Sequence, residues 1–278
     1  MTSVPAVIIT GAGSGIGRAT ALEFVSRGHD VILGVRNLAS AEAVADEARR
    51  RGFSRRVLSY ALDVGNLNSI SSFIAGLACS GVRISGLVNN AGVCRLRETF
   101  SPQEIESTLA INALGSFALS VLCLQRGIFF GRGKILNIGT HILPLELDRC
   151  RIEGSRRFSV RDAYMQSKLA MVMLAIGLAK RTPPDVCEIT SIYPGIVRSN
   201  LGRESPLTKL LGALFDPFIE APEKAALRIV DLYQQTAPLH GRIFSKSGPV
   251  VLKYKGDFQS DLAWLMDFAS KQTALSLV

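Results

Sequence analysis

Short apolar runs alternate with longer amphipathic stretches along nearly the whole chain of 278 residues. The runs are partly β-branched and are bounded by Gly, Pro or Asn, which is typical of buried strands. Strands that alternate with helices form parallel sheets with helices on both faces. The pattern therefore predicts one α/β domain over residues 1–278, with a doubly wound, seven-stranded parallel sheet. The expected strands are residues 6–10, 31–35, 57–62, 86–89, 135–138, 188–193 and 241–244.

A glycine-rich segment follows the first of these runs. Residues 10–17 read Thr-Gly-Ala-Gly-Ser-Gly-Ile-Gly and lead into a helical pattern. A strand, a glycine turn and a helix start form the context in which backbone amides bind a pyrophosphate, because glycines allow close approach and the helix dipole favours negative charge. The residues predicted to bind a dinucleotide here are Gly11, Ser14, Gly15, Ile16 and Gly17.

Tyr164 and Lys168 lie four residues apart in a predicted helix, which places them on one helical face. A phenol and an ammonium held together can carry out proton chemistry at neutral pH. By itself such a pair also fits an exposed aromatic beside a solvated charge. The upstream glycine segment favours the catalytic interpretation.

Further short motifs come at the ends of predicted strands. They are Asp63-Val64, Asn89-Asn90-Ala91-Gly92 and Tyr193-Pro194-Gly195. A single asparagine, Asn112, lies within a predicted helix. With the glycine segment and the Tyr–Lys pair, they resemble the short-chain dehydrogenase/reductase family over roughly residues 6–244. The resemblance implies a Rossmann-type fold, a nicotinamide cofactor and hydride transfer.

The resemblance also implies roles for the catalytic residues. In this family a tyrosine at the position of Tyr164 exchanges a proton with the substrate oxygen, which near neutrality needs a lowered phenol pKa. Lys168 would lower that pKa and hold the nicotinamide ribose, and Asn112 would hold a water beside the lysine. Thr140 occupies the place of the family's second serine and would polarise the substrate carbonyl, because threonine keeps the hydroxyl.

The remaining cofactor contacts are likewise implied by the resemblance. Ser199 replaces the usual threonine of the carboxamide-binding segment but retains its hydroxyl. The expected contacts are Asp63 and Val64 at the adenine, Asn89, Ala91 and Gly92 after the fourth strand, and Pro194, Gly195, Val197 and Ser199 at the carboxamide.

The end of the second strand, residues 34–37, indicates which nicotinamide cofactor is used. It reads Gly-Val-Arg-Asn and lacks the acid that would accept the ribose hydroxyls of NAD. Arg36, with Asn37 beside it, is placed to bind the 2′-phosphate of NADP with its guanidinium, although a solvent-facing arginine is the alternative. The sequence favours NADP(H).

Two segments depart from the regular alternation, an Arg-rich one at 141–163 and an apolar one at 199–221. Both follow strands, so we expect them to shape a substrate pocket; the second could instead be a core helix pair. The long gap before Tyr164 and the following Ser167-Lys168-Leu169-Ala170 are similar to the retinol dehydrogenase branch, which implies a hydrophobic carbonyl or alcohol substrate. The tail 257–278 could close the pocket, pack on a partner or rest on a membrane surface.

Composition excludes several other classes. The formal net charge is +9, but the arginine clusters at 49–56 and 149–161 contain only one aromatic each and match no known nucleic-acid motif, which favours a solvated basic surface over nucleic-acid binding. Five cysteines without a CxxC pair support neither a metal site nor a disulfide framework. The apolar runs at 114–124 and 169–179 are too short to span a membrane, and the N-terminus lacks a secretory pattern, so a cytoplasmic location is expected.

The sequence thus predicts an NADP(H)-dependent oxidoreductase that assembles, by the resemblance, as a homodimer or homotetramer. Two alternatives stay open: a redox-neutral reaction of isomerase, cyclase or lyase type on the same fold, and a non-catalytic NADP-sensing module. The clearest predicted helix start is the capping box at 101–104, Ser-Pro-Gln-Glu, in the helix that carries Asn112.

Overall fold

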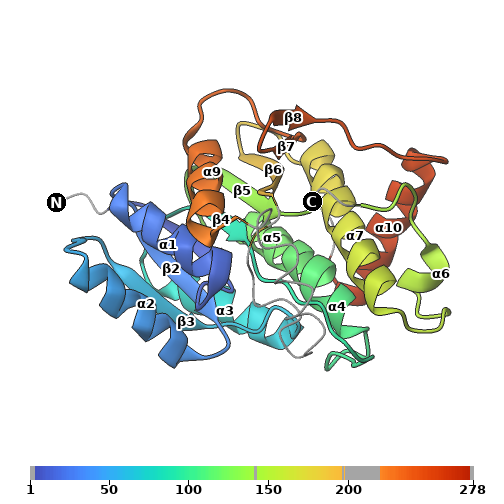
Figure 1. Cartoon of the computed structure of the whole chain (residues 1–278), viewed down its shortest axis with the longest axis horizontal. Coiled ribbons are helices and arrows are strands. Elements are labelled where there is room, and N and C mark those ends of the chain that lie inside the picture. Colours follow the sequence, from blue (N-terminus) through green and yellow to red (C-terminus); the bar gives the residue numbers. More distant parts are fainter. Residues whose placement is uncertain (1–3, 141–142, 196, 198–219, 276–278) are drawn as a thin grey trace.

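A single eight-stranded sheet forms the centre of the computed structural model, which describes residues 4–140, 143–195, 197 and 220–275. The strand order is β3-β2-β1-β4-β5-β6-β7-β8, so the chain runs outward to one edge and then crosses to β4 on the other side of β1 (Figure 1). The strands are β1 Ala6–Thr10, β2 Asp30–Val35, β3 Val57–Ala61, β4 Ile84–Asn89, β5 Phe129–Ile138, β6 Cys187–Tyr193, β7 Ile243–Ser245 and β8 Gly248–Val250.

The doubly wound architecture and all seven predicted strands are confirmed, and β1 to β7 pair in parallel. The predicted strand count of seven is wrong by one, because β8 pairs antiparallel with β7. Ser247 donates its backbone N–H to the Ser245 hydroxyl in the short turn that joins them. β8 has only three residues, too few to produce a recognisable apolar period.

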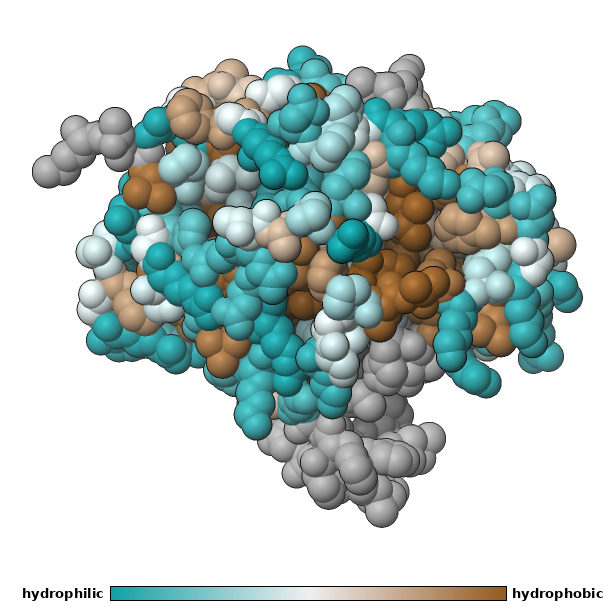
Figure 2. Space-filling model, turned by 90° about the horizontal axis from the view of Figure 1, so that it is seen from above, coloured by the Kyte–Doolittle hydropathy of each residue, from teal (hydrophilic) through white to brown (hydrophobic). Residues whose placement is uncertain are grey.

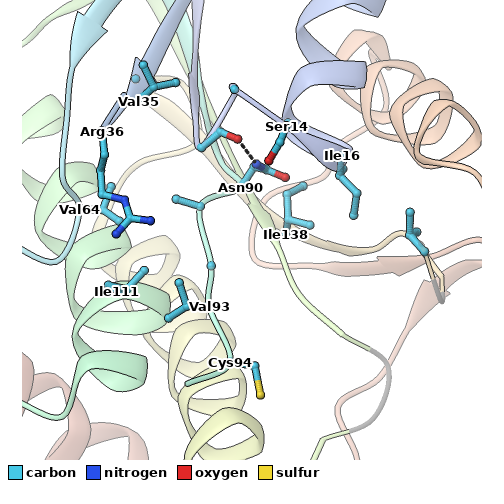
Figure 3. Close-up of a pocket in the computed structure, with 18 of the residues that line it drawn as sticks. Ser14, Ile16, Val35, Arg36, Val64, Asn90, Val93, Cys94, Ile111 and Ile138 are labelled. Atoms are coloured by element: carbon cyan, nitrogen blue, oxygen red, sulfur yellow. Dashed lines mark hydrogen bonds between the residues drawn. The ribbon is translucent and has the colours of Figure 1, made fainter. Parts of the chain in front are cut away.

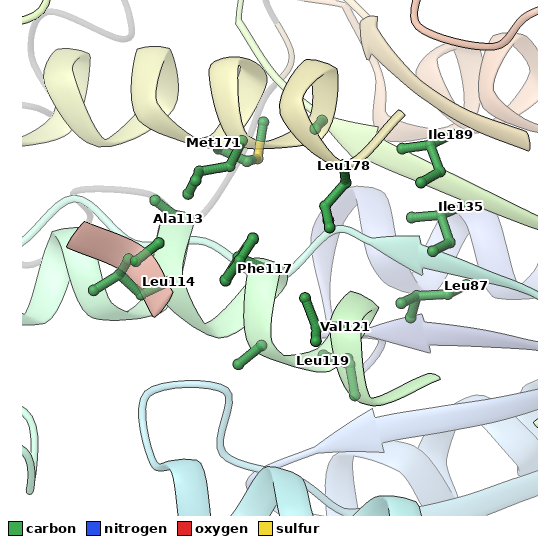
Figure 4. Packing of buried hydrophobic residues seen from close by; sticks show 14 of the residues in the cluster. Leu87, Ala113, Leu114, Phe117, Leu119, Val121, Ile135, Met171, Leu178 and Ile189 are labelled. Carbon is green, nitrogen blue, oxygen red and sulfur yellow. The ribbon is translucent and has the colours of Figure 1, made fainter. Parts of the chain in front are cut away.

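Helices cover both faces of the sheet (Figure 1). α1, α2 and α9 contribute to one buried cluster, whereas α3, α5, α7 and α10 contribute to the other. Figure 4 shows the second cluster, where Phe117 and Met171 lie between α5 and α7 and Leu87, Ile135 and Ile189 project from the strands. The helices are α1 Gly15–Ser26, α2 Leu38–Arg50, α3 Leu67–Cys79, α4 Ser107–Leu109, the π-helical η1 Ala110–Leu114, α5 Gly115–Gln125, α6 Arg149–Ile152, α7 Val160–Arg181, α9 Pro222–Gln234 and α10 Phe258–Thr273.

The helix that carries Asn112 begins later than the capping box at 101–104 predicts. The backbone N–H of Ser101 donates to the carbonyl of Ile105 at 2.8 Å, so a loop closes where the capping box was expected. Glu106 is the N-cap instead, and its carboxylate accepts hydrogen bonds from two amides in the first turn of the helix. The predicted start is therefore wrong, since loop closure uses the amide that the box would have satisfied.

α4, η1 and α5 run together as one helix, Ser107–Gln125, of 19 residues. By length and composition it could cross a membrane, so the apolar segment is longer than the run 114–124 considered in the sequence. However, 89% of its apolar window is buried inside the fold. Packing against the sheet and α7 explains this composition, as in the core helix of a globular domain.

The C-terminal tail packs on the chain itself. α10 buries Leu262, Leu265 and Met266, and it contacts α7 along its length. The Arg-rich segment joins this packing through Arg149, whose Nε donates to Asp261 Oδ1 at 2.7 Å and whose guanidinium lies 5.3 Å from the Trp264 ring centroid. Leu262, Leu265 and Met266 thus serve packing within the chain, a role that was not among the three considered for the tail.

The arginine clusters lie at the surface, largely in ion pairs. Arg51 pairs with Glu47 at 2.6 Å, and Arg56 pairs with Asp30 at 2.7 Å. Figure 2 shows one face of the molecule, where hydrophilic side chains prevail and apolar ones gather toward the centre. These pairs reduce the unpaired positive charge that the composition suggests.

Two glycine-to-alanine substitutions should change stability in opposite directions. A Cβ on Gly115 would collide with the backbone oxygen of Val64, whereas one on Gly76 in α3 would meet nothing within 4 Å. We expect Gly115→Ala to lower the free energy of unfolding by more than about 2 kcal/mol. Gly76→Ala should raise it by about 0.5–1 kcal/mol. Urea denaturation measures both; a neutral Gly115→Ala would contradict the packing of α5 against Val64.

Candidate active site

A cavity of about 660 Å³ opens at the carboxyl ends of the strands. It lies beside β1 and β4, which are neighbours in the sheet but not consecutive in the chain. This is the place where open α/β sheets bind ligands. The structure brings most predicted site residues to this cavity (Figure 3). The predicted residues that line it are Gly11, Ser14, Gly15, Ile16, Gly17, Arg36, Asn37, Asp63, Val64, Ala91, Gly92, Thr140, Tyr164, Lys168, Pro194, Gly195 and Val197.

The glycine segment forms a close turn between β1 and α1. A Cβ on Gly17 would lie 2.5 Å from the carbonyl oxygen of Gly11, so only glycine fits there. Ser14 is the N-cap of α1 with extended backbone, and its side chain makes no capping hydrogen bond. The free amides of the first helical turn and the Ser14 hydroxyl thus line the cavity, where the helix dipole favours an anion.

Thr10 at the end of β1 ties this turn to the loop after β4. Its hydroxyl oxygen accepts the backbone N–H groups of Asn90 at 3.0 Å and Ala91 at 2.9 Å. The side-chain amide of Asn90 donates to the Thr10 carbonyl at 2.8 Å. These hydrogen bonds therefore fix the positions of the two cavity-lining loops relative to each other. Sequence reasoning assigned no role to Thr10 or Asn90, although both lie within quoted motifs.

Asn89 does not line the cavity, contrary to the expected cofactor contact. Its side chain is buried in the core, where its amide nitrogen donates to Asn137 Oδ1 at 2.9 Å and to Ser120 Oγ at 3.0 Å. Successive side chains of a strand point to opposite faces. The structure therefore gives Asn89 a structural role between β4, β5 and α5, and it is Asn90 that faces the cavity (Figure 3).

Lys168 is buried on α7 and lines the cavity. Its Nζ donates to the carbonyl oxygen of Ile138 at 2.9 Å, which fixes the ammonium at the end of β5. Burial lowers the pKa of Lys168 to about 8, because the charged form loses its hydration.

The phenol of Tyr164 lines the same cavity, one helical turn before Lys168. Burial raises the pKa of Tyr164 to about 12, and the nearby Cys94 adds to this effect. The sequence predicted a lowered pKa for this tyrosine, but the direction in the structure is the reverse. Desolvation disfavours the charged phenolate, so the phenol holds its proton.

Asn112 lies next to the cavity and does not line it. Its Oδ1 accepts the backbone N–H of Val93 at 2.7 Å, and its Nδ2 donates to the Val93 carbonyl at 2.9 Å and to Ser167 Oγ at 3.0 Å. A Cβ on Gly92 would lie 3.2 Å from Asn112 Oδ1 and 3.4 Å from Lys168 Nζ, so the two side chains approach the same point. Asn112 thus positions the loop after β4 against α7.

Gly139 precedes Thr140 where the family pattern has a serine. A Cβ on Gly139 would lie 2.7 Å from Cε1 of Tyr193, whose ring fills the space beside the end of β5. The departure from the pattern is therefore a packing requirement of Tyr193. Thr140 itself lines the cavity with Tyr164, as expected.

Arg36 extends from the end of β2 into the cavity near Val64 and Ile111 (Figure 3). It makes no hydrogen bond or ion pair with any residue in the described ranges. Asn37 caps α2, accepting the N–H of Ala39 at 3.0 Å. An exposed guanidinium without an acid beside it suits a phosphate.

The turn at Pro194 and Gly195 is supported from α9. Arg228 donates from Nη1 to the Pro194 carbonyl at 2.5 Å and forms an ion pair with Glu220. Sequence reasoning missed Arg228, because no local pattern links residues so far apart in the chain. Ser199 lies outside the described residues, so its expected contact is not placed.

Several further residues line the cavity without having been predicted as contacts. The described part of the segment 141–163 is not among them, because it packs against α10 and the loop before it; the expectation that it shapes the pocket is wrong for those residues. The apolar segment 199–221 lies outside the described residues except at its last two positions. The additional cavity residues are Gly13, Gly34, Val35, Ser40, Leu62, Asn90, Val93, Cys94, Arg95, Ile111, Ile138 and Gly139.

A dinucleotide suits the chemistry of this cavity. The open amides of α1 and the unpaired Arg36 can bind phosphate groups, while Lys168 and Tyr164 lie on the wall nearer β5. In the part of the chain that the structure describes, no group of three His, Cys, Asp or Glu side chains could hold a metal ion. The donor set is that of a phosphate-bearing organic cofactor.

Comparisons with known proteins agree with this arrangement. A model of the short chain dehydrogenase family matches residues 5–209. Human retinol dehydrogenase 12 is 34% identical over 244 residues, covering 86% of this chain and 77% of the relative. Human retinol dehydrogenase 13 is 32% identical over 229 residues, covering 79% and 69%.

Solved structures show the same fold. A short-chain dehydrogenase from Sphingobium yanoikuyae, solved in complex with NADPH, superposes with a TM-score of 0.63 at 22% sequence identity. The match covers 83% of this chain and 84% of that one.

The buried Lys168 should leave a signature in the pH dependence of stability. Its pKa is lowered to about 8 in the folded protein, so between about pH 8 and 10.5 the unfolded chain binds more protons and stability rises with pH. Relative to Lys168→Met, the wild type should gain about 2 kcal/mol in unfolding free energy from about pH 7.5 to 9.5.

Urea denaturation at the two pH values measures this difference. Lys180→Met, at an exposed position of the same helix, is the matched control and should show a much smaller change. If wild type and Lys168→Met had parallel pH profiles, the lysine would not be desolvated as the structure shows.

Proposed function

The chain belongs to the short-chain dehydrogenase family, on its retinol dehydrogenase-like branch, and from that premise we propose that it is an NADP(H)-dependent oxidoreductase. It would transfer hydride between the nicotinamide and a carbonyl or alcohol group of a hydrophobic substrate. The observation that carries the proposal is one cavity with a phosphate-binding turn at one end and Thr140, Tyr164 and Lys168 at the other.

The proposed chemistry follows from the side chains around the reacting oxygen. Tyr164 keeps its proton because burial raises its pKa to about 12, so its hydroxyl can donate that proton to the substrate oxygen during reduction. The hydroxyl of Thr140 donates a hydrogen bond to the same oxygen and orients the carbonyl. The nicotinamide, when bound, supplies or accepts the hydride.

Lys168 supports this step from beneath. Its ammonium, held at the Ile138 carbonyl, stabilises the phenolate that Tyr164 becomes after donating its proton. With a pKa of about 8, Nζ can also return a proton near neutral pH. Asn112 acts through Val93 and Ser167, keeping the cavity wall and α7 in register.

The preference for NADP(H) is supported by Arg36. It lines the cavity at the end of β2, where no acidic residue would repel a 2′-phosphate. The Sphingobium relative is described in complex with NADPH. The preference for an apolar substrate is supported by Val93 and Ile138 on the cavity wall and by the names of the retinol dehydrogenase relatives.

Two further expectations stay predictions. The cytoplasmic location is expected from the short apolar runs and the lack of a secretory pattern. A homodimer or homotetramer is expected from the family resemblance. Mass measurement of the purified protein in solution tests the second. Neither is needed for the chemistry proposed here, because every proposed catalytic residue comes from one chain.

Arg36→Ala should weaken NADPH binding selectively. Loss of a charge-assisted contact to the 2′-phosphate should raise the Kd for NADPH by roughly 10- to 100-fold and change that for NADH by less than about threefold. Calorimetry with both cofactors measures the ratio. Arg50→Ala, an exposed arginine on α2 away from the cavity, is the matched control. Equal losses for NADH and NADPH would contradict the assignment.

Tyr164→Phe should remove turnover and leave cofactor binding intact. Without the hydroxyl no proton reaches the substrate oxygen, so kcat for ketone reduction should fall by about 10²–10⁴-fold. NADPH consumption is followed by its absorbance, and NADPH affinity by calorimetry. Turnover at the wild-type rate would refute Tyr164 as the acid, and a wild type that binds NADPH while converting a substrate without oxidising it would favour the redox-neutral alternative.

A further inference from the structure

Arg95 is a cation on the cavity wall without a partner among the described residues. It lines the same cavity as Tyr164, and its Nε atom is buried with no hydrogen-bond partner in the part of the chain that the structure describes. Within the described ranges it forms no ion pair, whereas ten other described arginines pair with an acid. A buried donor left unsatisfied is unfavourable unless a ligand supplies an acceptor.

The backbone around Arg95 is held firmly. Asn112 makes two hydrogen bonds to the backbone of Val93, at 2.7 and 2.9 Å. Cys94 comes next and lies near enough to Tyr164 to affect the pKa of its phenol. Arg95 follows directly, so the Asn112 contacts hold the backbone that leads into it.

This strip of chain lies at the substrate end of the cavity. In Figure 3, Val93 and Cys94 continue from Asn90 away from Val35 and the glycine turn. The phosphate-binding features, Arg36 and the N-terminus of α1, lie toward the other end. Arg36 and Arg95 are the two arginines among the described residues that line the cavity, and they serve different ends of it.

The acid that faces the adjacent Cys94 is already engaged. Glu106 lies close enough to affect the Cys94 thiol, but its Oε1 accepts the N–H of Thr108 at 2.8 Å and its Oε2 accepts that of Leu109 at 2.9 Å. Both oxygens therefore cap α4. The guanidinium of Arg95 remains available to a ligand in the cavity.

We propose that Arg95 forms a carboxylate-binding subsite, which makes the substrate a carbonyl or alcohol compound with an apolar body and a carboxylate at its far end. This inference rests on the proposed function, since it describes the substrate of the same site. The planar fork of a guanidinium matches the two oxygens of a carboxylate. Val93, which lies between Asn90 and Arg95 along this wall, supplies an apolar contact for the body between the two polar ends.

Binding to the protein saturated with NADP⁺ tests the subsite without turnover. The probes are straight-chain methyl-ketone acids of increasing length, each compared with its methyl ester by calorimetry. For at least one length the acid should bind roughly 10- to 100-fold more tightly than the ester. Arg95→Met should abolish this preference by weakening the acid alone. Arg97→Met removes the same charge at an exposed position outside the cavity and should retain the preference.

The proposal is overturned if no chain length shows an acid preference, or if the preference persists in Arg95→Met. It is also overturned if Arg95→Met weakens NADPH binding as much as Arg36→Ala does, because Arg95 would then belong to the cofactor. Acid binding through Arg95 with no NADPH consumption by any ketone would support the subsite and refute hydride transfer. The two proposals can therefore fail separately.

Discussion

The site depends on the junction between β1 and β4, where the direction of chain progression through the sheet reverses. Thr10 holds this junction with one hydroxyl, which accepts the amides of Asn90 and Ala91, while the side chain of Asn90 returns a hydrogen bond to the Thr10 carbonyl. These contacts set the glycine turn opposite the loop after β4. The cofactor end and the substrate end of the cavity both take their position from this contact, because Val93, Cys94 and Arg95 continue the same loop.

Burial then divides the chemistry of the site between two side chains of α7. The same desolvation raises the pKa of Tyr164 and lowers that of Lys168. The phenol therefore stays protonated and can donate its proton, and the pKa of the amine is brought closer to neutral pH. The family resemblance identified this pair but implied a lowered pKa for the tyrosine. That expectation took account of the lysine charge and not of the burial of the phenol.

The sequence was sufficient for the parallel sheet and for most of the cavity. Strands buried on both faces have a strong apolar signal, and glycine turns such as 11–17 are read locally. It was insufficient where tertiary contacts decide. The side of β4 on which Asn89 lies and the support of Pro194 by Arg228 depend on residues far away in the chain. The loop at 101–104 is closed instead by a local contact between Ser101 and Ile105, which competes with the capping box that the pattern suggests. The three-residue β8 was too short to give any pattern.

Isotope transfer tests the central claim most directly. NADPH carrying deuterium at the transferable position of its nicotinamide would be incubated with the protein and a hydrophobic ketone, and the product examined by mass spectrometry. The account predicts one deuterium on the former carbonyl carbon, with stoichiometric formation of NADP⁺. A product formed without deuterium, or with the label retained in the nicotinamide, would contradict hydride transfer and favour a redox-neutral use of this fold.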